Sequence, residues 1–299
     1  MSETHLNYSS KPRNGLAMVK ALVLPRAGFS SDVGLPNLQS HWRGASVNSS
    51  ELSDYFSTLE IQPFDYLPIC YPHVLAGTMH MNMLAHKVFP IRLLGALHLK
   101  NRITQYRPIK PGEMVDIDAK IGDYRLTDRG VEFDFVTDVS VKGQLVWQEI
   151  TIYFVRGMFG GKENPSETKS FELESLTDAS VIREWHIPTT RGRAYAKICG
   201  DYNPIHMSSW AAKMFGFKRD IAHGFGVMAQ ALDYSNALDD ISDGAAIQVD
   251  VVFKGPVFLG SDVTVRQNVE QDPDRYDLYC GDNSRPNICL AVKRLEVRG

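Results

Sequence analysis

Apolar and polar residues alternate along several segments of the chain with the period of two that β-strands require. Between residues 131 and 141, Val and Phe at most odd positions alternate with Glu, Asp and Ser at most even ones. Residues 145–155 and 247–253 show a similar alternation. Such a pattern gives a strand one buried face and one wetter face. It therefore predicts strands of an antiparallel sheet in these three segments.

Two other segments are apolar at most positions, which predicts buried helices. Residues 223–238 contain no Pro, and their two Gly residues lie close to the start. Residues 75–85 are rich in Met, a residue type that more often fills cores than forms a cofactor site. In each half of the chain, strand-like segments follow the predicted helix.

The chain contains an internal repeat near half its length. Three pairs of segments correspond in the same order, at offsets of 148, 150 and 142 residues: 108–117 with 256–265, Pro72-His73 with Ala222-His223, and 155–157 with 297–299. One such match could arise by chance, but three in order predict a duplication. A helix followed by antiparallel strands, twice over, is α+β architecture, and the two sheets could pair into one surface that hides edge strands.

Composition agrees with two ordinary globular domains. The chain has 299 residues, of which 43% are hydrophobic and 22% charged, and a domain takes about 150 residues. Residues 160–178 are polar and rich in breakers, so we predict an N-terminal domain over 1–160, a linker over 161–178 and a C-terminal domain over 179–299. The first forty or so residues show too weak a pattern for a prediction.

Charge and cysteine content narrow the class of protein. A net charge of −3 argues against a protein whose main task is to bind nucleic acid. The four cysteines have no Cys-x-x-Cys spacing, which indicates reduced thiols and a cytoplasmic location. No run approaches the roughly 20 apolar residues that span a membrane.

A dense polar segment between residues 195 and 224 has no counterpart in the first half. Asp201, Asn203 and His206 fall within six residues, and Pro204 stiffens the loop between them. A stiff loop can hold a carboxylate, an amide and an imidazole toward one site for proton transfer. Each residue alone is more often structural, and Gly224 could merely permit an unusual φ, so the combination carries the prediction.

The same segment resembles a known family. Asp-x-Asn-Pro-Ile-His at 201–206, Gly-Phe at 216–217 and Ile-Ala-His-Gly at 221–224 are similar to the motif of the MaoC-like (R)-specific enoyl-CoA hydratases. The duplicated layout resembles their double-hot-dog members, in which two long helices are each wrapped by an antiparallel sheet. The resemblance implies reversible hydration of trans-2-enoyl thioesters to (R)-3-hydroxyacyl thioesters in fatty acid metabolism. Cys199 stands where many relatives have Ser.

The resemblance also implies roles for four residues. Asp201 and His206 would hold a water molecule and share the acid and base work, with the assignment of each role left open. Asn203 would help fix the water and the loop. The backbone N–H of Gly224, at the start of a helix, would receive negative charge from the thioester oxygen.

The first half has lost the counterpart of residues 201–206, which we call the reactive loop. Subtracting about 150 from Asp201 and His206 leads to Glu51 and Phe56, in a stretch without Asn-Pro-x-His. We therefore expect one active site per chain, with the first half shaping a tunnel for the acyl chain.

Lys218 and Arg219 are candidate contacts for coenzyme A, whereas an acyl carrier protein would use a basic surface patch. No metal or cofactor is expected beyond the carrier itself, and the sequence leaves open whether the protein is a compact monomer or a homodimer.

Four alternatives stay weaker. A hot-dog thioesterase would place an acid on a long helix, but residues 225–232 and 75–85 contain none, although Asp233 follows. A non-catalytic thioester sensor would have no reason to keep a paired acid and base. A dinucleotide-binding module is suggested by the Gly-x-Gly-x-x-Ala match at 224–229, but no buried strand precedes this match. A zinc site is disfavoured because His73, His80 and His86 lack the spacing of helical zinc ligands.

Overall fold

The predicted alternating segments are strands in the structure, a computed structural model that describes residues 3–12, 26, 28–30, 33–63, 65–91, 96–159, 170–238 and 245–295. The strands are β1 (Thr4–Tyr8), β2 (Leu38–Ala45), β3 (Ala96–Gln105), β4 (Val115–Thr127), β5 (Gly130–Val141), β6 (Gln144–Arg156), β7 (Ser180–Ile187), β8 (Ala246–Phe253), β9 (Ser261–Asn268), β10 (Asp272–Cys280) and β11 (Ile288–Leu295). The helices are α2 (Ser49–Leu59), α3 (Tyr71–Ala85), α4 (Arg191–Cys199), α5 (Pro204–Met207), α6 (Ser209–Met214) and α7 (Gly224–Tyr234).

All these strands form one sheet that is built twice from the same plan. Its order is β1-β2-β4-β5-β6-β3-β8-β11-β10-β9-β7. The first half therefore runs β2-β4-β5-β6-β3, and the second half repeats it as β7-β9-β10-β11-β8. The halves join where β3 pairs antiparallel with β8, from Lys100 opposite Val252 to Gln105 opposite Ile247. The duplication and the continuous sheet predicted from the sequence are both confirmed.

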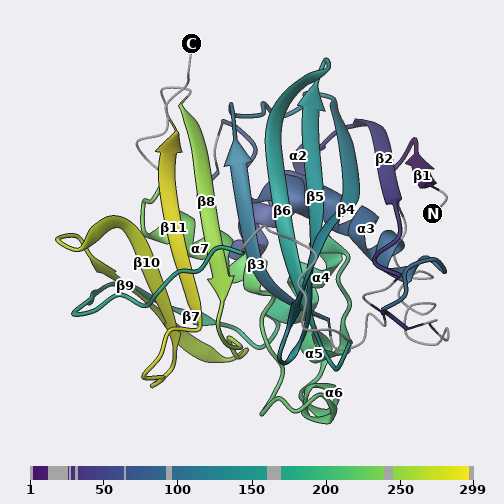
Figure 1. Ribbon diagram of the computed structural model, residues 1–299. Coiled ribbons are helices and arrows are strands. Elements are labelled where there is room, and N and C mark those ends of the chain that lie inside the picture. Colours follow the sequence, from purple (N-terminus) through teal and green to yellow (C-terminus); the bar gives the residue numbers. More distant parts are fainter. Residues whose placement is uncertain are drawn as a thin grey trace.

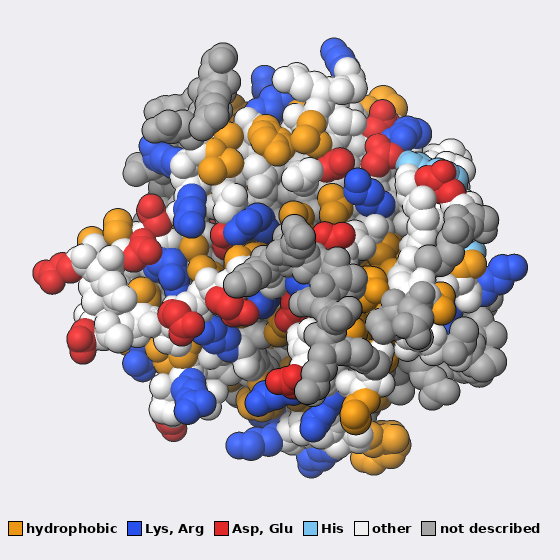
Figure 2. Space-filling view, viewed as in Figure 1, with side chains coloured by type: hydrophobic (Ala, Val, Ile, Leu, Met, Phe, Trp, Pro, Cys, Tyr) orange, Lys and Arg blue, Asp and Glu red, His pale blue; other side chains and the backbone are white. Residues whose placement is uncertain are grey.

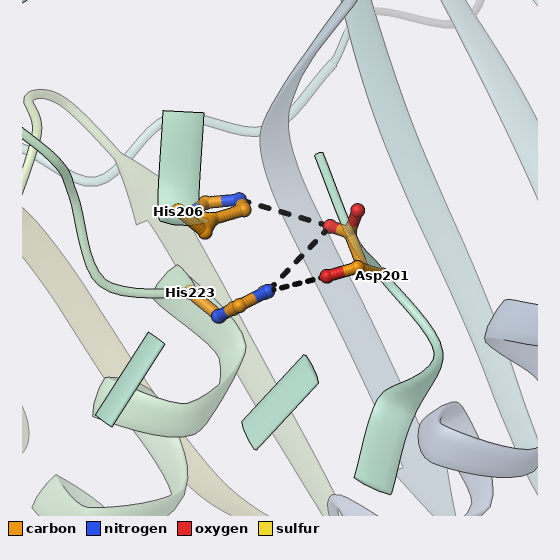
Figure 3. Close-up of side chains that lie close together, drawn as sticks. All are labelled: Asp201, His206 and His223. Carbon is orange, nitrogen blue, oxygen red and sulfur yellow. Dashed lines mark hydrogen bonds and ion pairs between the residues drawn. The ribbon is translucent and has the colours of Figure 1, made fainter. Parts of the chain in front are cut away.

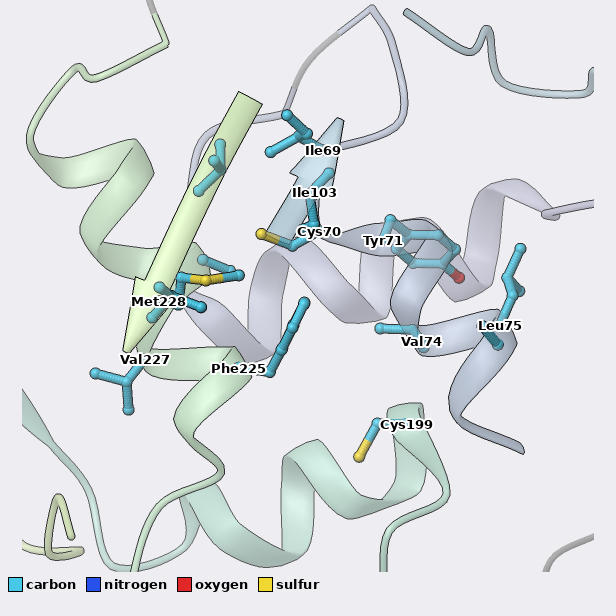
Figure 4. Packing of buried hydrophobic residues seen from close by; sticks show 14 of the residues in the cluster. Ile69, Cys70, Tyr71, Val74, Leu75, Ile103, Cys199, Phe225, Val227 and Met228 are labelled. Carbon is cyan, nitrogen blue, oxygen red and sulfur yellow. The ribbon is translucent and has the colours of Figure 1, made fainter. Parts of the chain in front are cut away.

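The helices lie on one face of this sheet, behind the strands in Figure 1. Apolar side chains of α3 and α7 pack against the strands in one large hydrophobic cluster, which includes Met79, Met83, Phe225 and Met228 (Figure 4). This is the double-hot-dog arrangement that the resemblance implied. No helix of the described residues is long and apolar enough to cross a membrane.

The opposite face of the sheet carries mixed charges (Figure 2). Arg102 on β3 and Asp250 on β8 form an ion pair of 2.6 Å across the junction of the halves. Residues 170–178, the described part of the predicted linker, cross this face (Figure 1), and Leu173 packs on Val252 and Cys289. Residues 161–169 and 297–299, the latter a member of the third repeat pair, lie outside the described residues.

The two halves show which residues correspond. Helix α2 follows β2 as α4 follows β7, and both helices end in a left-handed cap residue: Glu60 with φ 56° and Gly200 with φ 75°. The residue after the cap is Ile61 in one half and Asp201 in the other. Ile61 is buried in the core. The alignment of Glu51 and Phe56 with the reactive pair was therefore wrong, because both lie within α2, but the first half does lack the reactive loop.

Candidate active site

The loop that carries the reactive residues begins where α4 ends. Gly200 closes α4 in the left-handed region, which glycine adopts without strain. The N–H of Asp201 then donates to Sγ of Cys199 at 3.5 Å, so the sulfur serves the loop as a hydrogen-bond acceptor. Asn203 donates its N–H to Oδ1 of Asp201 at 3.0 Å, and its side-chain oxygen caps α5 by accepting from Ile205 N–H. Local hydrogen bonds thus hold the loop that the sequence predicted to be stiff.

Three side chains meet beside this loop (Figure 3). Oδ2 of Asp201 lies 3.7 Å from Nε2 of His206 and 4.0 Å from Nε2 of His223. The two imidazole rings are stacked, with their centroids 3.8 Å apart. Both histidines are buried, whereas the side chain of Asp201 is 32% exposed. One small molecule between Asp201 and His206 can therefore contact both groups.

Hydrogen bonds to the backbone orient the two histidines. Nδ1 of His206 donates to the carbonyl of Ile221 at 2.9 Å, so Nε2 is the ring nitrogen that faces Asp201. Nε2 of His223 lies 3.0 Å from the backbone carbonyl of Asp201 and donates to it. Burial, and then the neighbouring His206, lower the pKa of His223 to about 3. His223 is therefore neutral near pH 7 and positions the backbone of Asp201.

Gly224 follows His223 and is the first residue of α7. Its N–H has no hydrogen-bond partner among the described residues, and the positive end of the helix dipole lies there. A Cβ at this position would lie 2.7 Å from the ring of Phe253. Gly224 does not have a positive φ, so close packing, and not an unusual φ, requires glycine here.

These groups share one cleft of about 480 Å³. Asp201, Asn203, His206 and Gly224, the four predicted site residues, all line it, and so does His223. The first half supplies another part of the wall, from α3, β3 and β6: His73, Gly77, Met81, Ala96, Leu97, His98, Leu99, Tyr153 and Phe154. The two halves therefore build the cleft together.

The predicted carrier contacts lie beside the cleft. Phe217 lines it, but its neighbours Lys218 and Arg219 do not, whereas Lys254 does. Nε of Arg219 lies 3.5 Å from Oδ1 of Asp220. A role for Lys218 and Arg219 in carrier binding stays a prediction.

His223 is the site residue that the sequence reasoning missed. It lies within the Ile-Ala-His-Gly segment, for which the resemblance implies a role only of the backbone N–H of Gly224. Ligand atoms of Asp201, His206 and His223 lie within 4.8 Å of one another, so these three could also hold a metal ion. Two of the three histidines considered as zinc ligands have hydrogen-bond partners in the protein: His73 is paired with Glu149, and His80 is paired with Thr137.

Buried neutral histidines make the stability of the fold depend on pH. Burial lowers the pKa of His80 to about 4 and, with His206, that of His223 to about 3, from an ordinary value of 6.5. Below pH 6.5 the unfolded chain binds protons at these rings that the folded chain does not bind. The free energy of unfolding should therefore fall as the pH drops from 6.5 toward 4 for His80 and toward 3 for His223, by up to about 1.4 kcal/mol per pH unit for each ring.

Thermal unfolding at pH 7 and pH 5 tests this expectation. We expect a lower midpoint at pH 5, and a smaller difference between the two pH values in His80→Gln. The exposed His186 provides the matched control, since His186→Gln should keep the difference of the unchanged protein. Equal midpoints at both pH values in the unchanged protein would contradict the assignment of neutral buried rings.

Comparisons with known proteins show which proteins this chain is similar to. The model of the "MaoC like domain" matches residues 173–282. The chain is 32% identical over 265 residues to 3-hydroxyacyl-thioester dehydratase X of Mycobacterium tuberculosis, an alignment that covers 87% of this chain and 91% of that protein. The crystal structure of HtdX from the same organism superimposes with a TM-score of 0.71 at 26% identity, over 86% of this chain and 100% of that chain.

A third comparison concerns the fold alone. A conserved hypothetical protein of M. tuberculosis that has a double hot-dog fold superimposes with a TM-score of 0.58 at 10% identity, over 90% of this chain and 98% of that chain. Fold and site together define a double-hot-dog protein whose second half brings one carboxylate and two imidazoles together in a cleft. The chain belongs to the MaoC-like family.

Proposed function

We propose that this protein catalyses the reversible hydration of trans-2-enoyl thioesters to (R)-3-hydroxyacyl thioesters in fatty acid metabolism. The observation that carries the proposal is the meeting of Asp201, His206 and the unpartnered N–H of Gly224 in one cleft. The name of the 32% identical relative, a 3-hydroxyacyl-thioester dehydratase, describes the same reaction in reverse and supports it.

The geometry suits each step of this addition. Asp201 and the lone pair of His206 both accept hydrogen bonds from one water molecule, which adds its oxygen to C3 of the substrate. The pair takes one proton from this water and returns one proton to C2, so the site ends in its starting protonation state. Negative charge that develops on the thioester oxygen is received by the N–H of Gly224 at the start of α7.

A panel of trans-2-enoyl-CoAs of increasing chain length tests the proposal. We expect loss of the conjugated double bond and formation of the (R)-3-hydroxy product, and the reverse reaction from the (R)-3-hydroxyacyl-CoA. No reaction with any chain length, or an (S)-alcohol, would overturn it.

One active site per chain is part of the proposal. The position that corresponds to Asp201 in the first half is the buried, apolar Ile61, which can neither hold a water molecule nor move a proton. The first half instead contributes α3, β3 and β6 to the wall of the cleft. Either coenzyme A or an acyl carrier protein could deliver the thioester to this cleft.

The reaction needs no metal ion in this proposal, although Asp201, His206 and His223 could hold one. The carboxylate and imidazole can activate water without a Lewis acid. We expect the same hydration rate before and after dialysis against EDTA. A loss of activity that a divalent metal restores would instead assign these three residues to a metal site.

Release of free thiol from saturated acyl-CoAs measures the rival thioesterase activity. The acid that such an enzyme would need on a long helix is missing from α3, and in α7 it is limited to Asp233, one residue before the helix ends. We expect thiol release to be far slower than enoyl hydration. A protein that binds thioesters tightly but turns over neither substrate would be a sensor.

A further inference from the structure

The wall contributed by the first half contains a second polar cluster that the hydration does not use. His73, on the first turn of α3, lies with Nδ1 2.6 Å from Oε1 of Glu149 on β6. The same carboxylate accepts a hydrogen bond from Nδ2 of Asn101 on β3. Glu149 and Asn101 are fully buried, whereas the side chain of His73 is 13% exposed and lines the cleft. A buried acid and amide thus hold an imidazole at the cleft wall.

Two more polar side chains complete this cluster. The ring of His98 on β3 stacks near that of His73, with centroids 5.7 Å apart, and lies 5.4 Å from the ring of Tyr153 on β6. Both His98 and Tyr153 line the cleft. Neither the hydroxyl of Tyr153 nor Nε2 of His73 has a hydrogen-bond partner among the described residues. We call His73, His98, Asn101, Glu149 and Tyr153 the first-half polar cluster.

The cluster lies next to the reactive residues but on the side of the first half. Phe225 stacks on His73 with ring centroids 3.7 Å apart, and it directly follows Gly224. Farther along α3, Gly77 and Met81 line the cleft at helical spacing from His73. An acyl chain that extends from the thioester at Gly224 along α3 therefore passes the first-half polar cluster before it reaches apolar wall.

The charge and hydrogen-bonding capacity of this cluster select the group that it would bind. Burial acts to raise the pKa of Glu149, but His73 and the other donors outweigh burial and lower it, so the carboxylate is ionised. Glu149 accepts Nδ1–H of His73, which leaves Nε2 as the ring atom that can hydrogen-bond to a ligand. The Tyr153 hydroxyl can donate or accept. An anionic group would be repelled by Glu149, and a plain alkyl chain would leave both polar groups desolvated without partners.

We infer that the first-half polar cluster is a subsite for a hydroxyl group carried by the acyl chain of the substrate, away from the reacting double bond. A hydroxyl can both donate and accept a hydrogen bond, so it can satisfy Nε2 of His73 and the hydroxyl of Tyr153 at once. This inference rests on the proposed hydration and adds the class of acyl group: a chain that already bears an oxygen substituent. A reaction that hydroxylates acyl chains would have to supply such a substrate.

Matched pairs of trans-2-enoyl-CoAs test this inference. Each pair has one chain length, with a single hydroxyl at successive carbons beyond C4 or with none. When the hydroxyl stands at one or two particular carbons of the chain, we expect kcat/KM to be about 10-fold higher for the hydroxylated member of the pair. One or two buried hydrogen bonds contribute about this much. The preference should fall several-fold in Tyr153→Phe, which removes only the phenolic oxygen, and in the uncharged pair H73Q/E149Q.

Tyr106→Phe is the matched control, since Tyr106 is exposed and does not line the cleft, and it should keep the preference of the unchanged protein. Equal kcat/KM for both members at every hydroxyl position in the unchanged protein would overturn the subsite. So would a preference that survives Tyr153→Phe in full. Failure of the proposed function looks different, because then neither member of any pair is hydrated. If H73Q/E149Q does not fold, Tyr153→Phe and the substrate pairs still decide the question.

Discussion

Asp201→Asn should lower the turnover of enoyl-thioester hydration by about 100-fold or more. The amide keeps the size of the carboxylate and an oxygen for the N–H of Asn203, so the loop is preserved. It loses the negative charge that faces Nε2 of His206 and the capacity to take up a proton. His206→Ala should have an effect of the same size, because it removes the other half of the pair. Initial rates with one enoyl-CoA measure both variants.

The controls separate chemistry from folding. Asp262 and His186 form an exposed pair at 2.7 Å at the edge of the sheet, and neither residue lines the cleft. Asp262→Asn and His186→Ala should therefore keep normal turnover. All four variants should unfold at temperatures close to that of the unchanged protein. Near-normal rates in both Asp201→Asn and His206→Ala would remove these residues from the mechanism.

Gly192→Ala is expected to disable the enzyme from outside the cleft. Gly192 lies on the first turn of α4, and a Cβ there would lie 2.2 Å from the carbonyl oxygen of His206 and 2.9 Å from Leu259. The short helix that carries His206 must move to relieve this contact. Overpacking of this kind costs about 1 to 3 kcal/mol of stability, and a shift of about 1 Å in a catalytic group can cost about 100-fold in rate.

A second glycine provides the control for this prediction. Gly112 has φ of 83° in the turn before β4, and a Cβ there would meet no atom within 4 Å. Gly112→Ala should therefore cost about 1 to 2 kcal/mol through backbone strain alone, with hydration unaffected. The two variants are compared at equal loss of stability. If Gly192→Ala then loses no more activity than Gly112→Ala, the close packing of Gly192 against the backbone of His206 does not position the imidazole.

Local sequence patterns predicted much of the fold, and the misses have physical causes. Strands β5, β6 and β8 were predicted because one face of each is buried, and α7 because it is buried on most sides. Strand β7 was missed because it lies at the edge of the sheet and is exposed at six of its eight positions, which leaves no alternation. Helix α2 was missed although Asn48, which accepts a hydrogen bond from Glu51 N–H, is a cap residue that the sequence displays.

The candidate site was predictable only where its residues are close in sequence. Asp201, Asn203 and His206 share one loop, so a motif could bring them together before the fold was known. The pairing of His73 with Glu149 joins residues 76 positions apart, and no local pattern indicates it. A fixed offset between the halves failed at Glu51 and Phe56 because α5 and α6 stand between α4 and α7, while no helix stands between α2 and α3 among the described residues.

The pairing of β3 with β8 has a consequence for how this enzyme could change over time. In a dimer of identical subunits, every mutation appears in both copies. A substitution that enlarges the acyl pocket in one copy therefore also changes the same position beside the reactive residues of the other copy. Here the two halves are parts of one chain. The backbone hydrogen bonds between β3 and β8 hold them together even when side chains in either half change. Each half is therefore free to change alone, as it has where Ile61 of the first half stands in place of Asp201 of the second.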